Sequence, residues 1–405
     1  MQTLLMLVSP VSSFIVSLRF YKSSISMFFI LVFSYYFGSH FWMGNDATVH
    51  YMSMLSYFVG HDLSEILSNP AVMIDSSEPY VITLKYVLSR FTSSPTVFGG
   101  VIASLYALIL LHFLSQFSKF YKHSTSTICC LFLVTTLFIV EFTWYQGVRF
   151  WPGVLFFAGF YLRYLNTRKW IFFAISLLCP LFHFALYALD AAVLFSFLLK
   201  KSGKTITLAF IIISFVVKTL SIDFIPILLK SIPVLGDILS SALTSQRLRE
   251  DLLQTMENIR ENGNVVYMHR SDILAIFGLL IWGYFSTQHV KYDKLYLPLI
   301  YLAASLLIFA NFEYVDITFY DRFYKIANLI FYTFLTVTAY QNYHLIRRHS
   351  VVMIILILLP LCFALATDIV TFRDYLFKPE LWFGNFFIDW SGGMDEDILR
   401  YHWFV

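Results

Sequence analysis

Four polar residues lie at the ends or turns of long apolar segments, and their side chains suit phosphate binding and proton transfer. They are Asp46 in HFWMGNDATVHY, Arg149 in YQGVRFWPG, His183 in CPLFHFALYALD and Arg322 in FYDRFYKIAN. Arginine binds phosphate through a planar fork of N–H groups, and a neutral histidine or a carboxylate can take a proton from a hydroxyl. A charge buried in hydrocarbon costs about 2.5 kcal/mol or more, so such residues usually face a cavity, a partner or a substrate.

Each candidate also has an ordinary structural explanation. Arg149 and Arg322 could extend to lipid headgroups, and His183 could be a packed histidine that bonds a neighbouring carbonyl. Asp46 could cap the start of a helix. Asp190, about two helical turns after His183, fits a pairing inside a helix bundle better than a reacting group. Both explanations stay open for these residues.

The basic residues are sorted by loop, and this sorting indicates how the candidates are positioned. Half of the 28 Lys and Arg residues lie in six short spacers in which Asp293 is the only acid: Arg19, Lys22, Lys119, Lys122, Arg163, Arg168, Lys169, Lys200, Lys201, Lys204, Lys291, Lys294, Arg347 and Arg348. Lys and Arg in short loops stay on the cytoplasmic side of a membrane. The alternation predicts a chain that crosses a bilayer many times, with Asp46, Arg149, His183 and Arg322 near the outer face.

The composition agrees with a membrane protein. Hydrophobic residues make up 59% and charged residues 13% of the 405 positions, which leaves too few charges to cover a soluble globule. The net charge of +3 indicates membrane orientation rather than nucleic-acid binding. The cysteines lie in apolar segments, so neither a disulfide nor a metal site is expected of Cys129, Cys130, Cys179 and Cys362.

Apolar segments of about 20 residues are long enough to cross the hydrocarbon core. This rule predicts helices near 3–18, 24–42, 97–117, 127–143, 148–165, 205–226, 271–287, 295–311, 323–343 and 350–367. The stretch from Trp170 to Leu199 is too long for one crossing and lies between two basic spacers. We expect it to return to its own side through a helical hairpin or re-entrant pair that turns near Pro180 and His183. The predicted fold class is an all-α polytopic bundle of roughly 11–12 crossings, a single integral membrane domain over 1–405.

Both termini are expected outside, and the first helix lacks the basic start and cleavage site of a signal peptide. Three outer segments are too long for simple connections: 43–96, 227–270 and the tail 368–405. The middle segment contains LTSQRLREDLLQTMENIRENG, which fits an amphipathic helix on the membrane surface. The aromatics of the tail fit sugar stacking and a membrane-interface belt about equally.

A series of short motifs runs in order between residues 38 and 335. The residues are Gly38, Gly44, Asp46 and Tyr51, then Glu78 and Pro79, then Gly147, Val148 and Arg149, then Leu181, Phe182 and His183, and finally Arg322 and Phe323. This order resembles the EpsG family of polytopic proteins, which is related in role to Wzy-type polysaccharide polymerases. The chain departs from the family pattern at His40, where arginine is usual, and at Phe150, where glutamine is usual. These departures leave open a divergent polymerase or a relative with another acceptor.

The resemblance implies assembly of surface polysaccharide (O-antigen, capsule or exopolysaccharide) from repeat units on undecaprenyl diphosphate, at the periplasmic face of the bacterial inner membrane. The expected catalytic residues are His183 and Asp46, and the expected substrate-binding residues are Arg149, Arg322, Glu78 and Tyr51. The reaction needs cations for the departing diphosphate and a base for the acceptor hydroxyl, and we expect no cofactor and no metal. The expected partners are the lipid-linked oligosaccharide, membrane lipids and a chain-length regulator, without nucleic acid.

Two other functions stay open. A membrane glycosyltransferase that uses a polyprenyl-monophosphate sugar would place a carboxylate base in the first outer loop, where Asp46 lies. A lipid-linked oligosaccharide flippase would need polar groups through the depth of the bundle. Charges within the expected spans are few, chiefly Asp190, Lys218 and Asp223. This distribution favours chemistry at one face over translocation.

Overall fold

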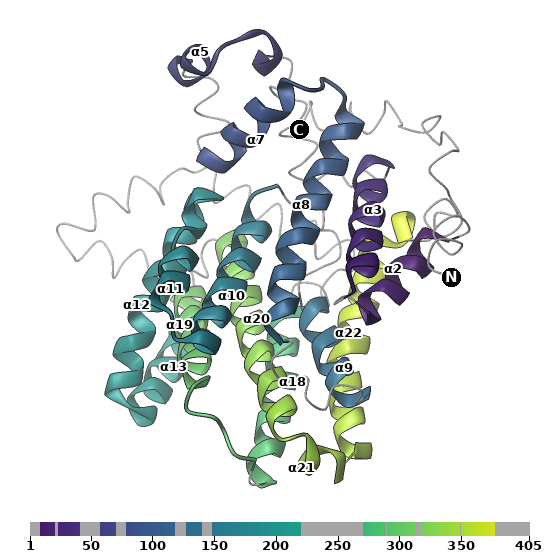
Figure 1. The fold of residues 1–405 in the computed structure, drawn as a ribbon. Coiled ribbons are helices and arrows are strands. Elements are labelled where there is room, and N and C mark those ends of the chain that lie inside the picture. Colours follow the sequence, from purple (N-terminus) through teal and green to yellow (C-terminus); the bar gives the residue numbers. More distant parts are fainter. Residues whose placement is uncertain are drawn as a thin grey trace, which may run out of the picture. The chain divides into compact units, whose positions relative to one another are not determined.

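The computed structural model describes residues 9–20, 23–40, 57–69, 78–117, 127–139, 148–219, 270–288, 290–312, 317–348 and 350–376. Every regular element in these ranges is a helix (Figure 1). The predicted all-α fold class is therefore confirmed for the described residues. The chain divides into two compact units, one of residues 1–119, 141–188 and 368–405, the other of residues 120–140 and 189–367. The expected single domain over 1–405 stays a prediction.

The first unit contains most of the N-terminal helices. They are α2 (Pro10–Arg19), α3 (Ser24–His40), α5 (Leu63–Ser68), α7 (Pro79–Ser89), α8 (Pro95–Gln116), α10 (Phe150–Thr167) and α11 (Trp170–Ser176), followed by the 3₁₀ helices η3 (Cys179–Leu181) and η4 (Phe184–Leu186). Three of these helices, α2, α7 and α8, begin with a proline. Proline suits this position because its φ is already helical and the first N–H of a helix has no helical partner. In this unit α3 and α10 both pack on α8.

A close approach of two backbones joins α3 to α8. A side chain on Gly38 of α3 would overlap the carbonyl oxygen of Gly99 and the Cβ of Ala103 in α8. Only glycine lets the helices meet this closely. Packing therefore explains Gly38, which the sequence analysis related to a family motif.

The long apolar stretch after Trp170 is broken, as its length and charge predict. Helix α11 ends at Ser176, and η3 and η4 lead into α12 (Tyr187–Ser202). Pro180 lies in η3, where it supplies no N–H to continue an α-helix. The predicted interruption near Pro180 and His183 is confirmed, whereas its place relative to a membrane face stays a prediction.

The second unit contains most of the C-terminal helices. They are α9 (Thr127–Phe138), most of α12, α13 (Lys204–Thr219), α18 (Arg270–Thr287), α19 (Leu297–Phe312), α20 (Ile317–Gln341), α21 (Tyr343–Arg348) and α22 (Ser350–Leu376), of which residues 350–367 belong to this unit. Buried hydroxyl and amide groups connect these helices. Thr136 and Thr336 Oγ1 atoms are 2.8 Å apart, and Ser305 Oγ donates to the Ala192 carbonyl oxygen at 2.8 Å. Such bonds are a common means of helix association where both helices are apolar.

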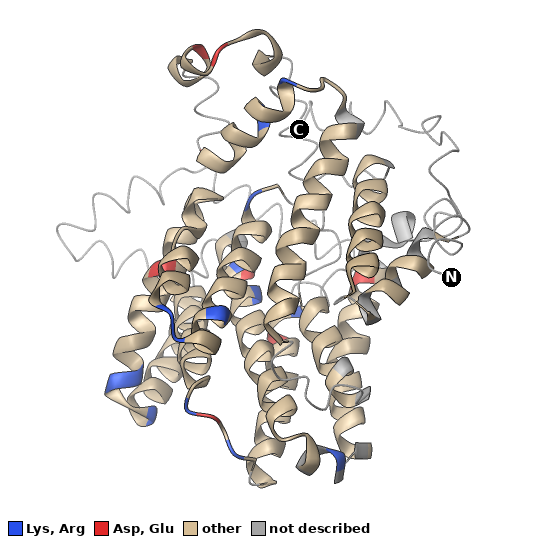
Figure 2. Ribbon diagram, in the orientation of Figure 1, with Lys and Arg blue, Asp and Glu red and all other residues tan. Residues whose placement is uncertain are grey.

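Two helices among the described residues are long and apolar enough to cross a membrane, over Val97–Gln116 in α8 and Val351–Ile369 in α22. Figure 2 shows that charged residues are absent from α8, and residues 350–367 of α22 also carry none. Shorter apolar helices cover Ser24–Ser39, Trp170–Leu181, Lys204–Val217 and Leu297–Phe312. The described part of the chain thus has two helices that fit a bilayer by length and composition.

Several boundaries differ from the sequence-based expectation. The helix expected near 323–343 begins at Ile317, so Arg322 lies within α20 and not at its start. The helix expected to end at 367 continues to Leu376, so the tail begins later than predicted. Arg270, expected as the end of an outer loop, is the first residue of α18 and is buried. The outer segments 227–270 and 368–405 lie mostly outside the described residues. Of the segment 43–96, residues 43–56 and 70–77 lie outside them, and the rest contains α5 and α7, two helices that the sequence analysis did not predict.

Candidate functional site

Three segments of the first unit meet at the start of α10. Tyr80 at the start of α7 packs its ring on Phe182, with centroids 4.4 Å apart. Phe150, the first residue of α10, meets the His183 ring edge to face at 5.5 Å. A side chain on Gly153 of α10 would lie 2.9 Å from Phe182 Cβ, so the η3–η4 turn packs directly on the α10 backbone. These contacts bring Glu78, Arg149 and His183 to one place in the unit.

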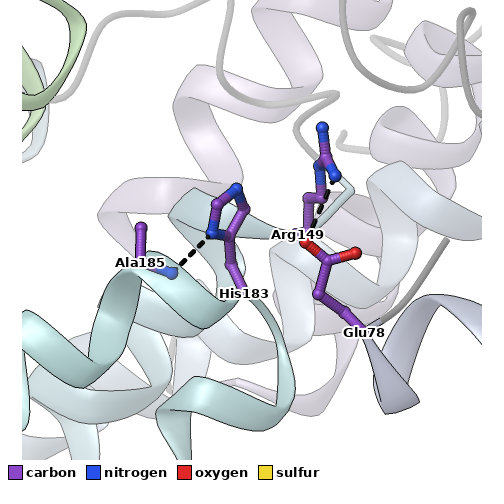
Figure 3. Close-up of polar contacts among 4 residues, drawn as sticks. All are labelled: Glu78, Arg149, His183 and Ala185. Carbon is purple, nitrogen blue, oxygen red and sulfur yellow. Dashed lines mark hydrogen bonds and ion pairs between the residues drawn. The ribbon is translucent and has the colours of Figure 1, made fainter. Parts of the chain in front are cut away.

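The central polar contact is an ion pair between Glu78 and Arg149. Arg149 Nη1 donates to Glu78 Oε1 at 3.2 Å, across 71 residues of sequence (Figure 3). The Glu78 side chain is 6% exposed and the Arg149 side chain 24% exposed. The guanidinium compensates the charge of the buried carboxylate. Without this partner, the buried charge of Glu78 would lower the free energy of unfolding by several kcal/mol, on the order of 3–5.

The ion pair with Arg149 engages only one of the two carboxylate oxygens of Glu78. Glu78 precedes α7 as its N-cap residue, yet its side chain makes no capping hydrogen bond. The Oε2 atom is buried and has no hydrogen-bond partner within the part of the chain that the structure describes. A buried acceptor without a partner costs about 1–3 kcal/mol, so an atom of this kind calls for an explanation.

His183 is held by the backbone of its own turn. Its Nδ1 accepts a hydrogen bond from the Ala185 N–H at 3.0 Å, which makes it the N-cap of η4 (Figure 3). Because Nδ1 accepts, the neutral ring carries its proton on Nε2. The ring is partly exposed, and the neighbouring Leu181 and Phe184 are 45% and 43% exposed. The site therefore has an open apolar border at the η3–η4 turn.

Tyr80 adds a hydroxyl to this region that the sequence analysis did not consider. Burial raises the pKa of Tyr80 to about 12, so the hydroxyl keeps its proton at neutral pH. Val81 of α7 lies in a buried cluster with Phe98, Ile102 and Val148. The sequence signal that could have identified Tyr80 is its position directly after the Glu78-Pro79 pair.

A second polar group lies in the second unit, at the start of α18 and the first half of α20. Tyr320 Oη donates to Asp272 Oδ1 at 2.9 Å, and Lys325 Nζ pairs with Asp321 Oδ2 at 2.5 Å. Arg270 is 1% exposed and donates from Nη2 to the Phe138 carbonyl oxygen at 3.0 Å. Sequence reasoning singled out none of these five residues. The charges of Arg270 and Lys325 next to apolar segments were the signal that could have found them.

The predicted site residues fall into three groups. Glu78, Arg149 and His183 belong to one arrangement in the first unit. Arg322 lies in α20 of the second unit, half-buried and beside the Asp321–Lys325 pair. Asp46 and Tyr51 lie outside the described residues. Their roles stay predictions.

The described residues contain no group of three or more His, Cys, Asp or Glu side chains that could hold a metal ion. Cys129, Cys179 and Cys362 are free thiols. Comparison of the chain with protein-family models, with curated proteins and with solved structures finds no match.

Proposed function

We propose that the chain is a multi-pass protein of the bacterial inner membrane that polymerises surface polysaccharide at the periplasmic face. In this proposal it transfers a glycan from an undecaprenyl diphosphate donor to a lipid-linked repeat-unit acceptor. The observation that supports the proposal most is the convergence of Glu78, Arg149 and His183. These residues belong to three of the motifs that resemble the EpsG family, and they come together from distant parts of the sequence.

The exposed faces of the second unit support membrane insertion beyond the two long helices. Large aliphatic side chains are exposed along α13 and α22, namely Ile206, Leu208, Ile212, Ile213, Val216, Val351, Val352, Ile355, Leu358 and Leu359. Soluble proteins rarely expose apolar surface over the length of a helix, whereas lipid-facing helices do so routinely. The shorter apolar helices supply further candidate crossings when tilt and flanking residues are included.

The chemistry of the site suits the proposed reaction. Arg149 places a guanidinium at the border of the site, and its side chain is a quarter exposed. A guanidinium can hold a carboxylate and a phosphate through different N–H groups, because it carries five donors in a rigid fork. Arg149 would stabilise the departing diphosphate. A role of Arg322 in diphosphate binding is a separate proposal, because it rests on the motif at Arg322 and Phe323 and on the chemistry of the guanidinium. The Glu78–His183 region would receive the acceptor sugar.

The test of the function is the lipid-linked glycan that accumulates when the gene is deleted. A polymerase mutant should accumulate single complete repeat units at the periplasmic face, and the purified protein in vesicles should join these units into polymer. Accumulation of truncated units would favour the polyprenyl-monophosphate transferase. Complete units that remain on the cytoplasmic side would favour the flippase.

The proposed orientation predicts a labelling pattern. In a variant without the four natural cysteines, Arg260→Cys should react with a membrane-impermeant thiol reagent in intact spheroplasts, because segment 227–270 is expected outside. The matched control is Lys201→Cys in a basic spacer, which should react only after the membrane is opened. The reverse pattern would overturn the topology together with the proposed placement of the site.

A conservative replacement tests the role of Arg322. Arg322→Lys keeps the positive charge but loses the planar fork, so we expect the rate of polymer formation to fall at least about tenfold while the protein amount is unchanged. The control is Arg347→Lys, the same chemical change at an exposed residue of a basic spacer. Full polymer yield from Arg322→Lys would remove Arg322 from diphosphate binding.

A further inference from the structure

We infer that Glu78 is the base that takes the proton of the acceptor hydroxyl, and that His183 serves the same site as a hydrogen-bond donor. This inference rests on the proposed function, and it divides the roles differently from the sequence-based hypothesis, in which His183 or Asp46 is the base. Two observations carry it: the hydrogen bond that His183 makes within its turn, and the buried oxygen that Glu78 leaves without a partner.

His183 is poorly arranged to accept a proton. Its Nδ1 lone pair is taken by the Ala185 N–H, and proton uptake there would break the bond that caps η4. Its Nε2 already carries the proton of the neutral ring, so it has no lone pair to offer. The neutral ring therefore carries a donor at Nε2 and has no lone pair that could take the hydroxyl proton without breaking the cap of η4.

Glu78 has the opposite character. Its Oε1 is held by Arg149 at 3.2 Å, so the carboxylate is anchored and its charge compensated. Its Oε2 is buried, and no described residue donates to it. An acceptor fixed in this way is ready for a hydroxyl that arrives with a substrate, and a buried carboxylate is a suitable general base.

The step balances with these two residues. The oxygen of the acceptor hydroxyl forms a bond to the anomeric carbon of the donor glycan, while the bond from that carbon to the diphosphate oxygen breaks. The electron pair of the broken bond leaves with undecaprenyl diphosphate, whose charge Arg149 helps to stabilise. The hydroxyl proton passes to Glu78 Oε2 and later to water.

The deciding variants keep the shape of each side chain and change one function. Glu78→Gln keeps the volume and an oxygen for Arg149 but is not a base. Glu78→Asp keeps a carboxylate, but its side chain is one methylene shorter, so the carboxylate lies farther from the position of Oε2. His183→Gln places an amide N–H near the position of Nε2, and His183→Asn places an oxygen near the position of Nδ1. The histidine variants thus separate donation to substrate from capping of η4.

The assay uses the purified protein in vesicles. Its substrate is the lipid-linked repeat unit extracted from cells in which the gene for this protein is deleted. We expect Glu78→Gln to lower kcat by about 10²–10⁴-fold with KM and melting temperature near those of the wild type. His183→Gln should stay within about tenfold of the wild-type rate, while His183→Asn and His183→Ala fall well below it.

The outcomes separate this inference from the function on which it rests. A wild-type protein that makes no polymer from the extracted repeat unit overturns both. With an active wild type, a Glu78→Gln protein that works within about tenfold of it overturns the role of Glu78 alone. Equal loss in His183→Gln and His183→Ala, together with an active Glu78→Gln, returns the base to His183.

Discussion

Arg149→Ala is expected to abolish polymer formation and to destabilise the first unit by about 3 kcal/mol. The substitution leaves the Glu78 carboxylate, 6% exposed, without its compensating charge, and removing one partner of a buried ion pair is strongly destabilising. It also removes the cation proposed for the departing diphosphate. Denaturant titration of the purified protein in detergent measures the first effect, and the vesicle assay measures the second.

Two companion variants separate stability from activity. The double variant Glu78→Gln with Arg149→Ala removes the orphaned charge and should recover most of the lost stability without any activity. Arg149→Lys should be almost as stable as the wild type but much less active, because lysine supplies charge without the fork. If Arg149→Ala unfolds at the same denaturant concentration as the wild type, the ion pair contributes nothing to stability and the buried state of Glu78 needs another explanation.

Arg270→Ala is expected to have the largest effect on the second unit, a loss of about 3–5 kcal/mol. The side chain is 1% exposed, so its removal leaves a cavity at the start of α18. It also removes the donor to the Phe138 carbonyl oxygen, 3.0 Å from Nη2, at the end of α9. The last carbonyls of a helix have no partner within the helix, and a cation beside them is favourable.

Arg270→Met separates the effect of the cavity from the effect of the lost hydrogen bond. Methionine keeps much of the volume of arginine but donates no hydrogen bond. Its loss relative to the wild type should be about 1–3 kcal/mol, and the difference between Met and Ala measures the cavity. Lys294→Ala, at an exposed position of the same unit, should stay within about 0.5 kcal/mol of the wild type. Thermal unfolding in detergent checks all three. A fully stable Arg270→Ala protein would contradict the buried position of this side chain.

The positions of the long apolar helices were predictable from the sequence because they depend on local properties, whereas α5 and α7 lie in a segment expected to be an outer loop. Segments expected near 24–42, 97–117 and 148–165 correspond to α3 (Ser24–His40), α8 (Pro95–Gln116) and α10 (Phe150–Thr167). Runs of apolar residues and prolines at helix starts act over a few residues, so no knowledge of packing is needed. The break near Pro180 was predictable for the same reason.

The partners of the buried polar groups were decided by the tertiary structure alone. Glu78 and Arg149 were each singled out from the sequence, but their pairing across 71 residues, which leaves Oε2 without a partner, depends on how α7 and α10 pack. From the sequence, Arg270 was expected to lie in an outer loop. In the structure it begins α18 and donates to the carbonyl oxygen of Phe138, 132 residues away. The sequence alone determined which residues carry charge beside apolar segments. Their roles depend on contacts between distant segments, because the energy of a buried charge is set by the groups around it in space.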